Sequence, residues 1–337
     1  MITRENVLVT GGGGFLGKAI IKKLLKNGNY VKSFSRNYYP ELKDIGVSQI
    51  QGDISHANAV KKACKNIDVV YHVAAKTGIW GNFSNYFKVN VLGTTNVIKS
   101  CLNNKVARLV YTSSPSVVFD GNDLKGINES ASYPRKYYAH YPKTKAMAEK
   151  LVKNAGYKDL KTIILRPHLI WGPGDNHLFP RIIKKASKLK ILGNRKNFVD
   201  TIYIDNAADA HILANHSLKK NPLLSGNIYF ISQDEPILLW DMIDKFLNIA
   251  GFPSVKGSVP AWTAWFMGFL FEFLFFLLKL EQEPPMTRFL AKELTTSHWF
   301  DISKAKKDLG YSPDISTKEG LYRLKKWFKS QSNKNNF

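Results

Sequence analysis

Cysteine and arginine are scarce in this chain, and each scarcity excludes a class of function. Only two cysteines, Cys64 and Cys101, occur among the 337 residues. Two thiols at this spacing build neither a zinc site nor a disulfide framework, so we expect buried, unreactive thiols and no metal centre. A strand expected almost directly after Met1 leaves no room for a secretory leader. We therefore expect a reducing, cytoplasmic location.

Positive charge is abundant, but it comes almost entirely from lysine. The 49 basic residues comprise 9 Arg and 40 Lys, against 26 acidic residues, and the formal net charge is +23. Arginine is the usual residue that contacts base edges, and no expected helix clusters it. We therefore expect a solvated lysine surface and no nucleic-acid partner, with attraction to an anionic membrane face as an alternative.

Short apolar runs alternate with helical stretches over the first two thirds of the chain. This pattern predicts the α/β class, with a Rossmann-type, doubly wound parallel sheet. Strands are expected at 6–10, 30–35, 69–72, 108–112, 162–166 and 227–232, and helices at 14–27, 58–64, 86–103 and 141–154. We place a dinucleotide-binding domain at 1–170 with a returning segment near 200–232. A smaller C-terminal substrate domain at 171–327 and a flexible basic tail at 328–337 follow.

Four consecutive glycines follow the first expected strand. Gly12, Gly14 and Gly17 fit G-x-G-x-x-G, whereas Gly11, Gly14 and Gly17 fit G-x-x-G-x-x-G. Either spacing between a strand and a helix lets the backbone approach a pyrophosphate at the helix N-terminus. A tight structural turn is the alternative. We predict a dinucleotide bound by Gly11, Gly14, Phe15, Leu16 and Gly17.

The end of the second expected strand favours NADP(H) over NAD(H). A carboxylate here would bind the ribose 2′-hydroxyl of NAD, but the stretch 33–36 carries Ser35 and Arg36 instead. A hydroxyl and a guanidinium suit a 2′-phosphate. Asp53 and Ile54 end the third strand, where Asp53 either meets the adenine amino group or caps the next helix.

A tyrosine and a lysine four residues apart begin the helix expected at 141–154. The same spacing occurs at Tyr157/Lys161 and Tyr322/Lys326, but only Tyr141 and Lys145 combine a helix start with an upstream strand that ends in hydroxyls, Thr112, Ser113 and Ser114. A lysine ammonium beside oxidised nicotinamide would lower the tyrosine pKa from its usual value of about 10. Ser114 could hydrogen-bond a developing oxyanion. We predict that Ser114, Tyr141 and Lys145 catalyse hydride chemistry at a hydroxyl or ketone carbon; an ordinary interfacial tyrosine is the alternative.

Six motifs together resemble the extended short-chain dehydrogenases/reductases. They are Thr10-Gly11-x-x-Gly14-x-x-Gly17, Tyr71-His72-x-Ala74-Ala75, Asn90-Val91-x-Gly93-Thr94, Tyr111-Thr112-Ser113-Ser114, Tyr141-x-x-x-Lys145 and Leu165-Arg166-Pro167. The resemblance implies the register G-x-x-G-x-x-G and the same three catalytic residues. Several relatives carry Thr at the position of Ser114, so Ser113 could share its role. The resemblance also extends the cofactor-binding set, with Asn90 supporting the site and the last two residues flanking the nicotinamide: Ala74, Ala75, Lys76, Asn90, Thr112, Ser113, Tyr141, Lys145, Pro167 and His168.

Motifs near the C-terminus resemble the 3β-hydroxysteroid dehydrogenase branch of that family, so that the likeness covers about residues 5–327. They are Pro285-x-Thr287-Arg288, Phe300-Asp301-x-x-Lys304-Ala305 and Asp308-Leu309-Gly310-Tyr311-x-Pro313. The stretches 39–42, 75–81, 169–175 and 283–285 are similar to the bacterial 2-alkyl-3-oxoalkanoate reductases of long-chain olefin synthesis. That likeness implies NADPH-dependent reduction of the 3-ketone of a long-chain 2-alkyl-3-oxoalkanoate, and a homodimer, with other enzymes of the pathway as further partners. A sterol 3β-hydroxy dehydrogenase and a non-catalytic NADP(H)-sensing membrane scaffold are the alternatives.

Residues 261–280 form the longest apolar run, AWTAWFMGFLFEFLFFLLKL. A helix of this length would be about 30 Å long. Gly268, Glu272 and Lys279 would lie on one narrow stripe of it, and a carboxylate at mid-segment is costly in lipid. We favour a helix or hairpin that dips into a membrane face, peripherally at its inner side. A buried lid over a lipophilic substrate and a true membrane span are the alternatives.

Overall fold

Seven parallel strands form the central sheet of the protein. A computed structural model describes residues 4–158 and 160–334. The strand order is β12-β7-β5-β4-β1-β2-β3, which confirms the doubly wound α/β class. The strands are β1 (Asn6–Thr10), β2 (Tyr30–Ser35), β3 (Ser48–Gln51), β4 (Val69–His72), β5 (Arg108–Thr112), β7 (Lys161–Pro167) and β12 (Asn227–Ile231).

Six of these strands lie where the apolar runs predict them, within one residue at each end. The seventh, β3, has no range among the expected strands; the sequence analysis ends a third strand at Asp53 and Ile54, whereas β3 ends at Gln51. Its sequence is Ser-Gln-Ile-Gln, and none of its four residues is fully buried. A polar strand at the edge of a sheet carries no apolar run, so the sequence alone gives little indication of it.

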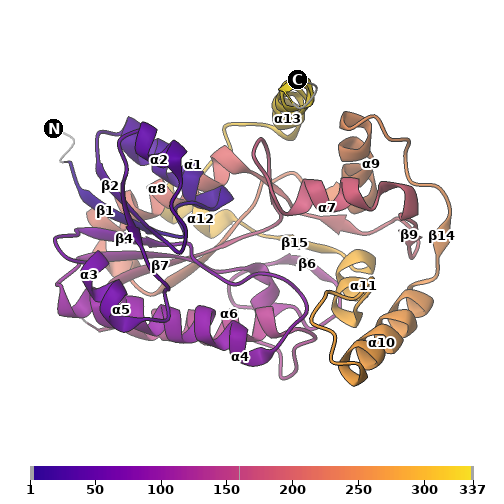
Figure 1. Cartoon of the computed structure of the whole chain (residues 1–337), viewed down its shortest axis with the longest axis horizontal. Helices are drawn as coiled ribbons and strands as arrows, with labels where there is room; N and C mark the ends of the chain where they lie inside the picture. The colour runs from indigo at the N-terminus through magenta and orange to yellow at the C-terminus, as the bar shows by residue number, and fades with distance from the viewer. Residues whose placement is uncertain (1–3, 159, 335–337) are drawn as a thin grey trace.

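Helices cover both faces of this sheet (Figure 1). On one face α1 packs against α8 and α8 against α12, while α3, α5 and α6 pack together on the other. The bounds are α1 (Phe15–Lys26), α2 (Pro40–Asp44), α3 (Ala57–Ala63), α4 (Phe83–Tyr86), a π-helix (Phe87–Leu92), α5 (Gly93–Asn103), α6 (His140–Gly156), α8 (Ile204–Lys220) and α12 (Ser303–Leu309). Cys64 and Cys101 are free and buried beneath the second face, as expected.

A smaller region lies beyond the carboxyl edge of the sheet, on the right in Figure 1. Its largest sheet has the order β13-β10-β15-β6, and two pairs, β11-β8 and β14-β9, flank it. The strands are β6 (Leu124–Ile127), β8 (Ile170–Trp171), β9 (Ile191–Leu192), β10 (Phe198–Val199), β11 (Ile202–Tyr203), β13 (Ile237–Leu238), β14 (Ser258–Val259) and β15 (His298–Phe300). The helices are α7 (Leu178–Lys184), α9 (Leu239–Ile249), α10 (Ala261–Leu277) and α11 (Arg288–Thr295). Short 3-10 turns span Pro115–Val118, Ala186–Lys188 and Pro222–Leu224.

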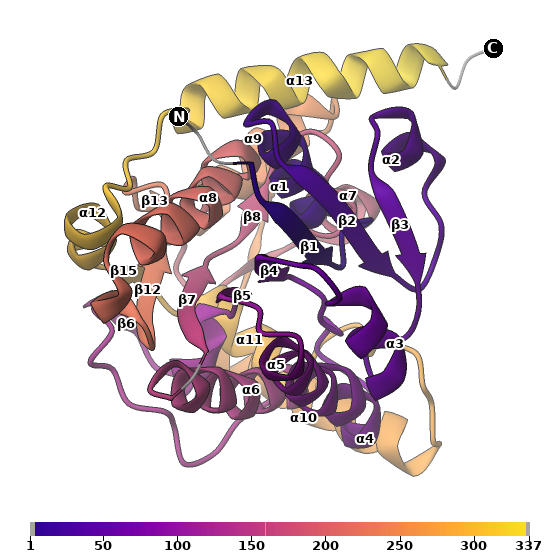
Figure 2. The same ribbon diagram turned by 90° about the vertical axis from the view of Figure 1, so that its left-hand side faces the viewer.

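The chain ends in the helix α13 (Thr317–Lys334), on the side of the molecule away from α10 (Figure 2). The sequence predicts a flexible tail from residue 328, but α13 continues through residues 328–334. The Phe328 ring contacts the Phe179 ring, with centroids 5.5 Å apart, and Leu324 is fully buried. These contacts stabilise a helix that its Lys-, Ser- and Asn-rich sequence does not favour by itself. Residues 335–337 lie outside the described chain.

Candidate active site

The glycine turn lies at the point where the strand order reverses, between β1 and β4. Gly11 has a φ of +70°, which a side chain would strain. A Cβ on Gly11 would approach the Ala74 nitrogen of the β4 loop to 2.9 Å, and a Cβ on Gly17 would approach the Gly12 Cα to 2.8 Å. The turn is therefore pressed against both the β4 loop and the first turn of α1. Such a switch point is where open parallel sheets bind nucleotides.

Gly14 differs from its neighbours because space remains beside it. A Cβ on Gly14 would meet only the Gly11 carbonyl oxygen, at 3.2 Å, whereas Cβ atoms on Gly12 and Gly13 would overlap Ser33 and Tyr39. Gly14 is also the N-cap of α1, which has no side-chain cap and no acidic residue in its first turn. An uncapped helix N-terminus with open backbone suits a pyrophosphate. The geometry therefore favours the cradle prediction over a purely structural turn.

Ser35 and Arg36 lie where the sequence places them, at the carboxyl end of β2 beside this turn. The Gly13 amide donates to the Ser35 hydroxyl over 3.3 Å. The side chain of Gln49 holds the Tyr39 backbone through two hydrogen bonds of 2.9 and 2.8 Å, which fixes the Tyr39 ring over Gly13. Arg36 is exposed. Ser35 and the Tyr39 ring thus contact the glycine turn, Arg36 follows at the end of β2, and the stretch 33–39 has no acidic residue.

Asp53 does not cap a helix. Its carboxylate accepts hydrogen bonds from the Ser55 amide and hydroxyl, at 2.8 and 2.7 Å, and the N-cap of α3 is His56. The Ser55 amide holds the pKa of Asp53 below its usual value. The helix-cap interpretation of Asp53 is therefore wrong, and Ile54 beside it is buried under Gly93. Instead of capping a helix, the Asp53 carboxylate closes a turn with Ser55 two residues later.

Asn90 links the β4 loop to α6. Its side-chain oxygen accepts from the Lys76 amide at 2.7 Å, and its amide donates to the Lys76 carbonyl and to the Thr144 hydroxyl, each at 3.0 Å. Asn90 lies in the π-helix Phe87–Leu92, an irregularity that is frequent at functional sites. This agrees with a supporting role for Asn90, because it fixes the loop 74–76 relative to α6.

Tyr141, Lys145 and Ser114 come together at the carboxyl edge of the sheet. Tyr141 and Lys145 lie one turn apart at the start of α6, and the Lys145 ammonium donates to the Thr112 carbonyl at the end of β5 over 2.6 Å. The Ser114 hydroxyl lies close enough to Tyr141 to lower its pKa, and the Ser116 amide donates to Ser114 over 3.3 Å. Thr112 itself is held by His211, at 2.8 Å. The buried Ser113 hydroxyl has no hydrogen-bond partner within the described chain.

Burial sets the protonation of the pair in the protein alone. It raises the pKa of Tyr141 to about 12, against the opposing effect of the Ser114 hydroxyl, and it lowers the pKa of Lys145 to about 7. The sequence analysis expects the lysine ammonium to lower the tyrosine pKa, but desolvation has the largest influence on that pKa and raises it. Tyr141 is consequently protonated at neutral pH, the state that a proton donor to a ketone requires.

The lowered pKa of Lys145 makes the stability of the fold depend on pH. Between about pH 7 and the usual lysine value of 10.5 the unfolded chain binds more protons than the folded one. The cost of burying the ammonium is therefore greatest below pH 7 and declines as the pH rises. We compare the melting temperature of Lys145→Met with that of wild type by thermal unfolding. The difference, variant minus wild type, should be more positive at pH 6 than at pH 9. Lys150→Met, an exposed lysine of the same helix, should show no such pH trend; an equal change at both pH values for Lys145→Met would contradict the assignment.

The sequence analysis missed a buried ion pair one helical turn after Lys145. Glu149, one turn after Lys145, accepts two hydrogen bonds from Arg166, at 3.0 and 2.6 Å, and one from the Tyr133 hydroxyl at 2.7 Å. Glu149 and Arg166 are 0% and 1% exposed. The carboxylate also favours the charged form of Lys145, whose pKa it raises against burial. The sequence did contain an indication of this pair, because Glu149 lies four residues after Lys145 and therefore on the same face of the helix.

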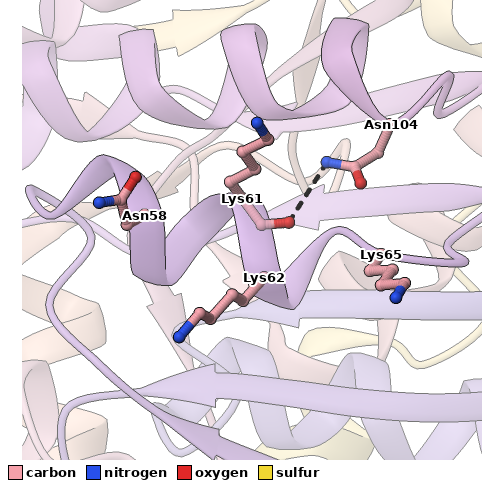
Figure 3. A pocket seen from close by; sticks show the side chains of 5 residues that line it. All are labelled: Asn58, Lys61, Lys62, Lys65 and Asn104. Carbon is pink, nitrogen blue, oxygen red and sulfur yellow. Dashed lines mark hydrogen bonds between the residues drawn. The ribbon is translucent and has the colours of Figure 1, made fainter.

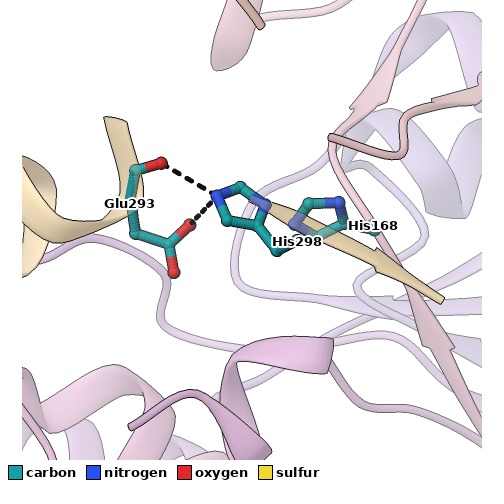
Figure 4. Close-up of side chains that lie close together, drawn as sticks. All are labelled: His168, Glu293 and His298. Carbon is teal, nitrogen blue, oxygen red and sulfur yellow. Dashed lines mark hydrogen bonds and ion pairs between the residues drawn. The ribbon is translucent and has the colours of Figure 1, made fainter. Parts of the chain in front are cut away.

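His168 belongs to a buried histidine cluster on the substrate side of the site. Its Nδ1 hydrogen-bonds the Asp200 carbonyl at 2.7 Å, and its ring meets that of His298 at 4.9 Å between centroids. His298 Nε2 donates to the Glu293 carbonyl at 2.8 Å. Figure 4 shows Glu293, His298 and His168 close together, and one possible ligand atom of each lies within 4.8 Å of the others. These three side chains could therefore hold a metal ion, although the sequence analysis expects no metal centre. Burial lowers the pKa of His168 to about 3, and His168 is therefore neutral.

An apolar wall lies beside the Tyr141 end of α6. Phe119, Ala139 and Phe289 form a buried cluster against which Ile79 and Leu124 pack. Ala139 is the N-cap of α6, two residues before Tyr141, and Phe289 belongs to α11. This buried cluster packs α11 against the segment that leads into α6.

A cavity of about 320 Å³ lies elsewhere, between α3 and the end of α5 (Figure 3). It is lined by Asn58, Lys61, Lys62, Lys65 and Asn104. Asn104 and Lys65 precede β5 and β4, so this cavity lies at the amino edge of the sheet. Nucleotides bind at the opposite, carboxyl edge, and the cavity has no part in the site described above.

Comparisons with known proteins agree with this geometry. Residues 8–259 match the model of the 3-beta hydroxysteroid dehydrogenase/isomerase family. The chain is 47% identical to a 2-alkyl-3-oxoalkanoate reductase of Shewanella oneidensis, over 95% of this chain and 86% of that protein. It is 32% identical to the decarboxylating sterol-4-alpha-carboxylate 3-dehydrogenase of Mus musculus, over 94% and 88% of the two chains. Among solved structures, the UDP-glucuronic acid 4-epimerase of Bacillus cereus in complex with NAD is similar with a TM-score of 0.74 and 25% identity, over 97% of this chain and 99% of that one.

Proposed function

Because the chain belongs to the 3-beta hydroxysteroid dehydrogenase/isomerase family, we propose that it reduces the 3-ketone of a long-chain 2-alkyl-3-oxoalkanoate to the 3-hydroxy acid with NADPH. The observation that carries the reaction type is the meeting of Ser114, Tyr141 and Lys145 beside an open glycine turn at the switch point of the sheet. The 47% identity to a 2-alkyl-3-oxoalkanoate reductase supports the substrate class.

Each of the three side chains has a distinct part in the reduction. A nicotinamide cofactor supplies the hydride that reaches the ketone carbon. Tyr141, protonated because burial raises its pKa to about 12, donates its proton to the ketone oxygen, which completes the hydroxyl. Ser114 donates a hydrogen bond to the same oxygen as negative charge develops on it. Lys145, held by the Thr112 carbonyl, provides a donor and, when protonated, a positive charge on the cofactor side of Tyr141.

The second β-strand supports NADP(H) as the cofactor. Ser35 and Arg36 offer a hydroxyl and a guanidinium where NAD-specific proteins place a carboxylate. A 2′-phosphate would gain a charge-assisted pair with Arg36, which can be bidentate. Arg36 is exposed, so it is free to close over an entering phosphate.

Arg36→Ala should therefore weaken the binding of NADPH and leave the binding of NADH unaffected. Losing a charge-assisted hydrogen-bond pair costs about 1.5–3 kcal/mol, or roughly 10–100-fold in affinity. We expect KM for NADPH to rise by that factor, with KM for NADH within about twofold of wild type, in steady-state assays with both cofactors. The matched control is Arg135→Ala, because Arg135 is also exposed but lies between β6 and α6, outside the glycine turn and β2. An equal rise for both cofactors would assign Arg36 to general binding instead.

A sterol 3β-hydroxy dehydrogenase activity is the second candidate, and one observation favours it. The mouse protein at 32% identity is named for a sterol that carries a carboxylate at carbon 4 and reacts at carbon 3. A 2-alkyl-3-oxoalkanoate likewise carries its carboxylate on the carbon next to the reacting one. Both substrates thus place an acid beside the reacting carbon and a bulky apolar body beyond it, which suits the Phe119–Phe289 wall.

The deciding experiment follows absorbance at 340 nm with purified protein in detergent. A synthetic long-chain 2-alkyl-3-oxo acid is supplied with NADPH or NADH, and a 4-carboxysterol alcohol is supplied with NADP⁺ or NAD⁺. We expect multiple-turnover NADPH consumption with the keto acid and formation of the 3-hydroxy acid. Turnover with the sterol alone would move the protein to the second candidate. Cofactor binding without turnover on either substrate would indicate the non-catalytic sensor.

A further inference from the structure

The helix α10 turns its few polar and small residues toward the protein. Ala264 and Gly268 are its buried residues, and a Cβ on Gly268 would approach the Arg288 amide nitrogen to 2.7 Å. Glu272, the one ionisable residue of α10, accepts from the Arg288 amide at 2.7 Å and from its guanidinium at 2.6 Å. The stripe that the sequence shows at 268 and 272 is therefore the contact with α11, and the carboxylate is neutralised there.

The opposite face of α10 is exposed and apolar along its whole length. Phe276 is 78% exposed and Trp262 72% exposed, and these values exclude a buried lid. Throughout α10, all of which is described, the exposed side chains are hydrocarbon, thioether or indole; they belong to Ala261, Trp262, Trp265, Phe266, Met267, Phe269, Leu270, Phe273, Leu274, Phe276 and Leu277. A contiguous apolar surface of this kind marks an interaction site. Among the described residues, no helix is both long and apolar enough to cross a bilayer.

The apolar face continues onto the segment before α5. The Trp80 indole donates to the Leu280 carbonyl over 3.1 Å, and its ring meets Phe275 edge-on at 6.3 Å. Phe83 and Phe87 follow, with ring centroids 5.8 Å apart, and Phe87 is exposed. Both ribbon views place α4 and α10 on the same side of the molecule (Figures 1 and 2). We call α10 together with Trp80, Phe83 and Phe87 the apolar face.

Exposed lysines border this face, and two exposed glutamates, Glu281 and Glu283, follow α10, of which Glu283 is paired with Arg181. Between Asp68 and Asp120 the chain has no acidic residue, and that stretch includes the whole of α4, the π-helix and α5. Lys88 and Lys143 are exposed beside Phe87 and Phe83; the Lys143 ammonium lies 5.0 Å from the centre of the Phe83 ring. Lys279 is exposed just after α10. Each lysine near an anionic bilayer contributes about 1 kcal/mol of attraction.

We propose that the apolar face docks on the surface of an anionic lipid bilayer, with α10 lying in the plane of the membrane interface. Its phenylalanine and leucine side chains enter the boundary between headgroups and acyl chains, and Trp262 and Trp265 lie at headgroup level. A protein partner would be expected to find about one hydrogen-bonding group per 100–200 Å² of interface. The hydrogen-bonding side chains exposed on this face of α10 are indoles alone. Such a surface is better suited to contact with lipid hydrocarbon than with a protein.

Docking in this orientation also brings the substrate side of the site toward lipid. The helix α11, anchored to α10 through Arg288 and Glu272, carries Phe289 of the apolar wall beside Tyr141. The membrane proposal itself does not depend on the proposed reaction, because it rests only on the exposure and charge of the apolar face.

Vesicle flotation of the full-length protein tests the proposal. Vesicles of phosphatidylglycerol and phosphatidylethanolamine are compared with pure phosphatidylcholine, at low and high salt. We expect wild-type protein to float with the anionic vesicles and to release at least partly at 0.5 M salt, as screening requires at roughly a 4 Å Debye length. Phe273→Glu/Phe276→Glu should reduce the bound fraction at least tenfold, and Lys88→Gln/Lys143→Gln should remove the preference for anionic lipid.

The matched control is Leu223→Glu/Tyr157→Glu, which places two acids on residues 89% and 65% exposed elsewhere on the surface. It should float like wild type, and circular dichroism should show that all variants are folded. Wild-type protein that ignores anionic vesicles, or Phe273→Glu/Phe276→Glu protein that still floats, would overturn the proposal. A wild-type oligomer that this variant converts to a monomer, with no flotation of either, would assign the face to a second copy of the chain.

Discussion

Replacing Tyr141 with phenylalanine is expected to lower kcat for ketone reduction by roughly 10²–10⁴-fold, the usual contribution of a positioned general acid. The phenol is half-buried at the start of α6, with Ser114 beside it and its pKa raised to about 12. Phenylalanine preserves the ring and removes only the phenolic hydroxyl, and with it the proton that would be donated. The dissociation constant of NADPH, measured by fluorescence titration, should therefore stay within about threefold of wild type.

Tyr157→Phe is the matched control for this variant. Tyr157 begins the same Tyr-x-x-x-Lys spacing with Lys161, but its ring is 65% exposed and lies at the end of α6 instead of its start. Its kcat should equal that of wild type. A Tyr141→Phe enzyme that retained wild-type turnover would refute the proton-donor role, whatever the identity of the substrate.

Removing the carboxylate behind the site should have the largest effect on stability. Glu149→Leu leaves the Arg166 guanidinium buried without its counter-ion, and the Tyr133 hydroxyl loses its acceptor. Breaking one partner of a buried ion pair costs about 3–5 kcal/mol. We expect the free energy of unfolding to fall by that amount in urea titrations. Because Glu149 also favours the charged form of Lys145, the pKa of Lys145 should fall further.

Two further variants separate the buried charge from the loss of volume. Glu149→Leu/Arg166→Met removes both charges and should recover much of the lost stability, since apolar replacement of a whole buried pair is often neutral. Lys306→Met breaks an ion pair whose side chains are both nearly half exposed, and it should cost at most about 1 kcal/mol. A single Glu149→Leu variant no less stable than Lys306→Met would show that Arg166 is not left unpaired.

Local sequence patterns determined most of the sheet, the glycine turn and the placement of Tyr141 and Lys145. Apolar runs with β-branched residues place β1, β4 and β5 almost to the residue, because a strand buried on both faces must be largely apolar. The glycine turn and Tyr141/Lys145 are equally local. The glycine turn requires positions such as Gly11 and Gly17, where a Cβ would clash with neighbouring backbone. The Tyr141/Lys145 pair requires two side chains one helical turn apart.

Tertiary structure alone decided which groups meet across the chain and which face of a helix is exposed. Glu149 reaches Arg166, and His168 reaches His298, through strands and helices that are distant in sequence. The sequence of α10 allows a span, a lid or an interfacial helix. The contacts of Gly268 and Glu272 with Arg288 select one outward face. Helical periodicity shows that a stripe exists, but only the packing of a neighbouring element determines whether that stripe faces protein or solvent.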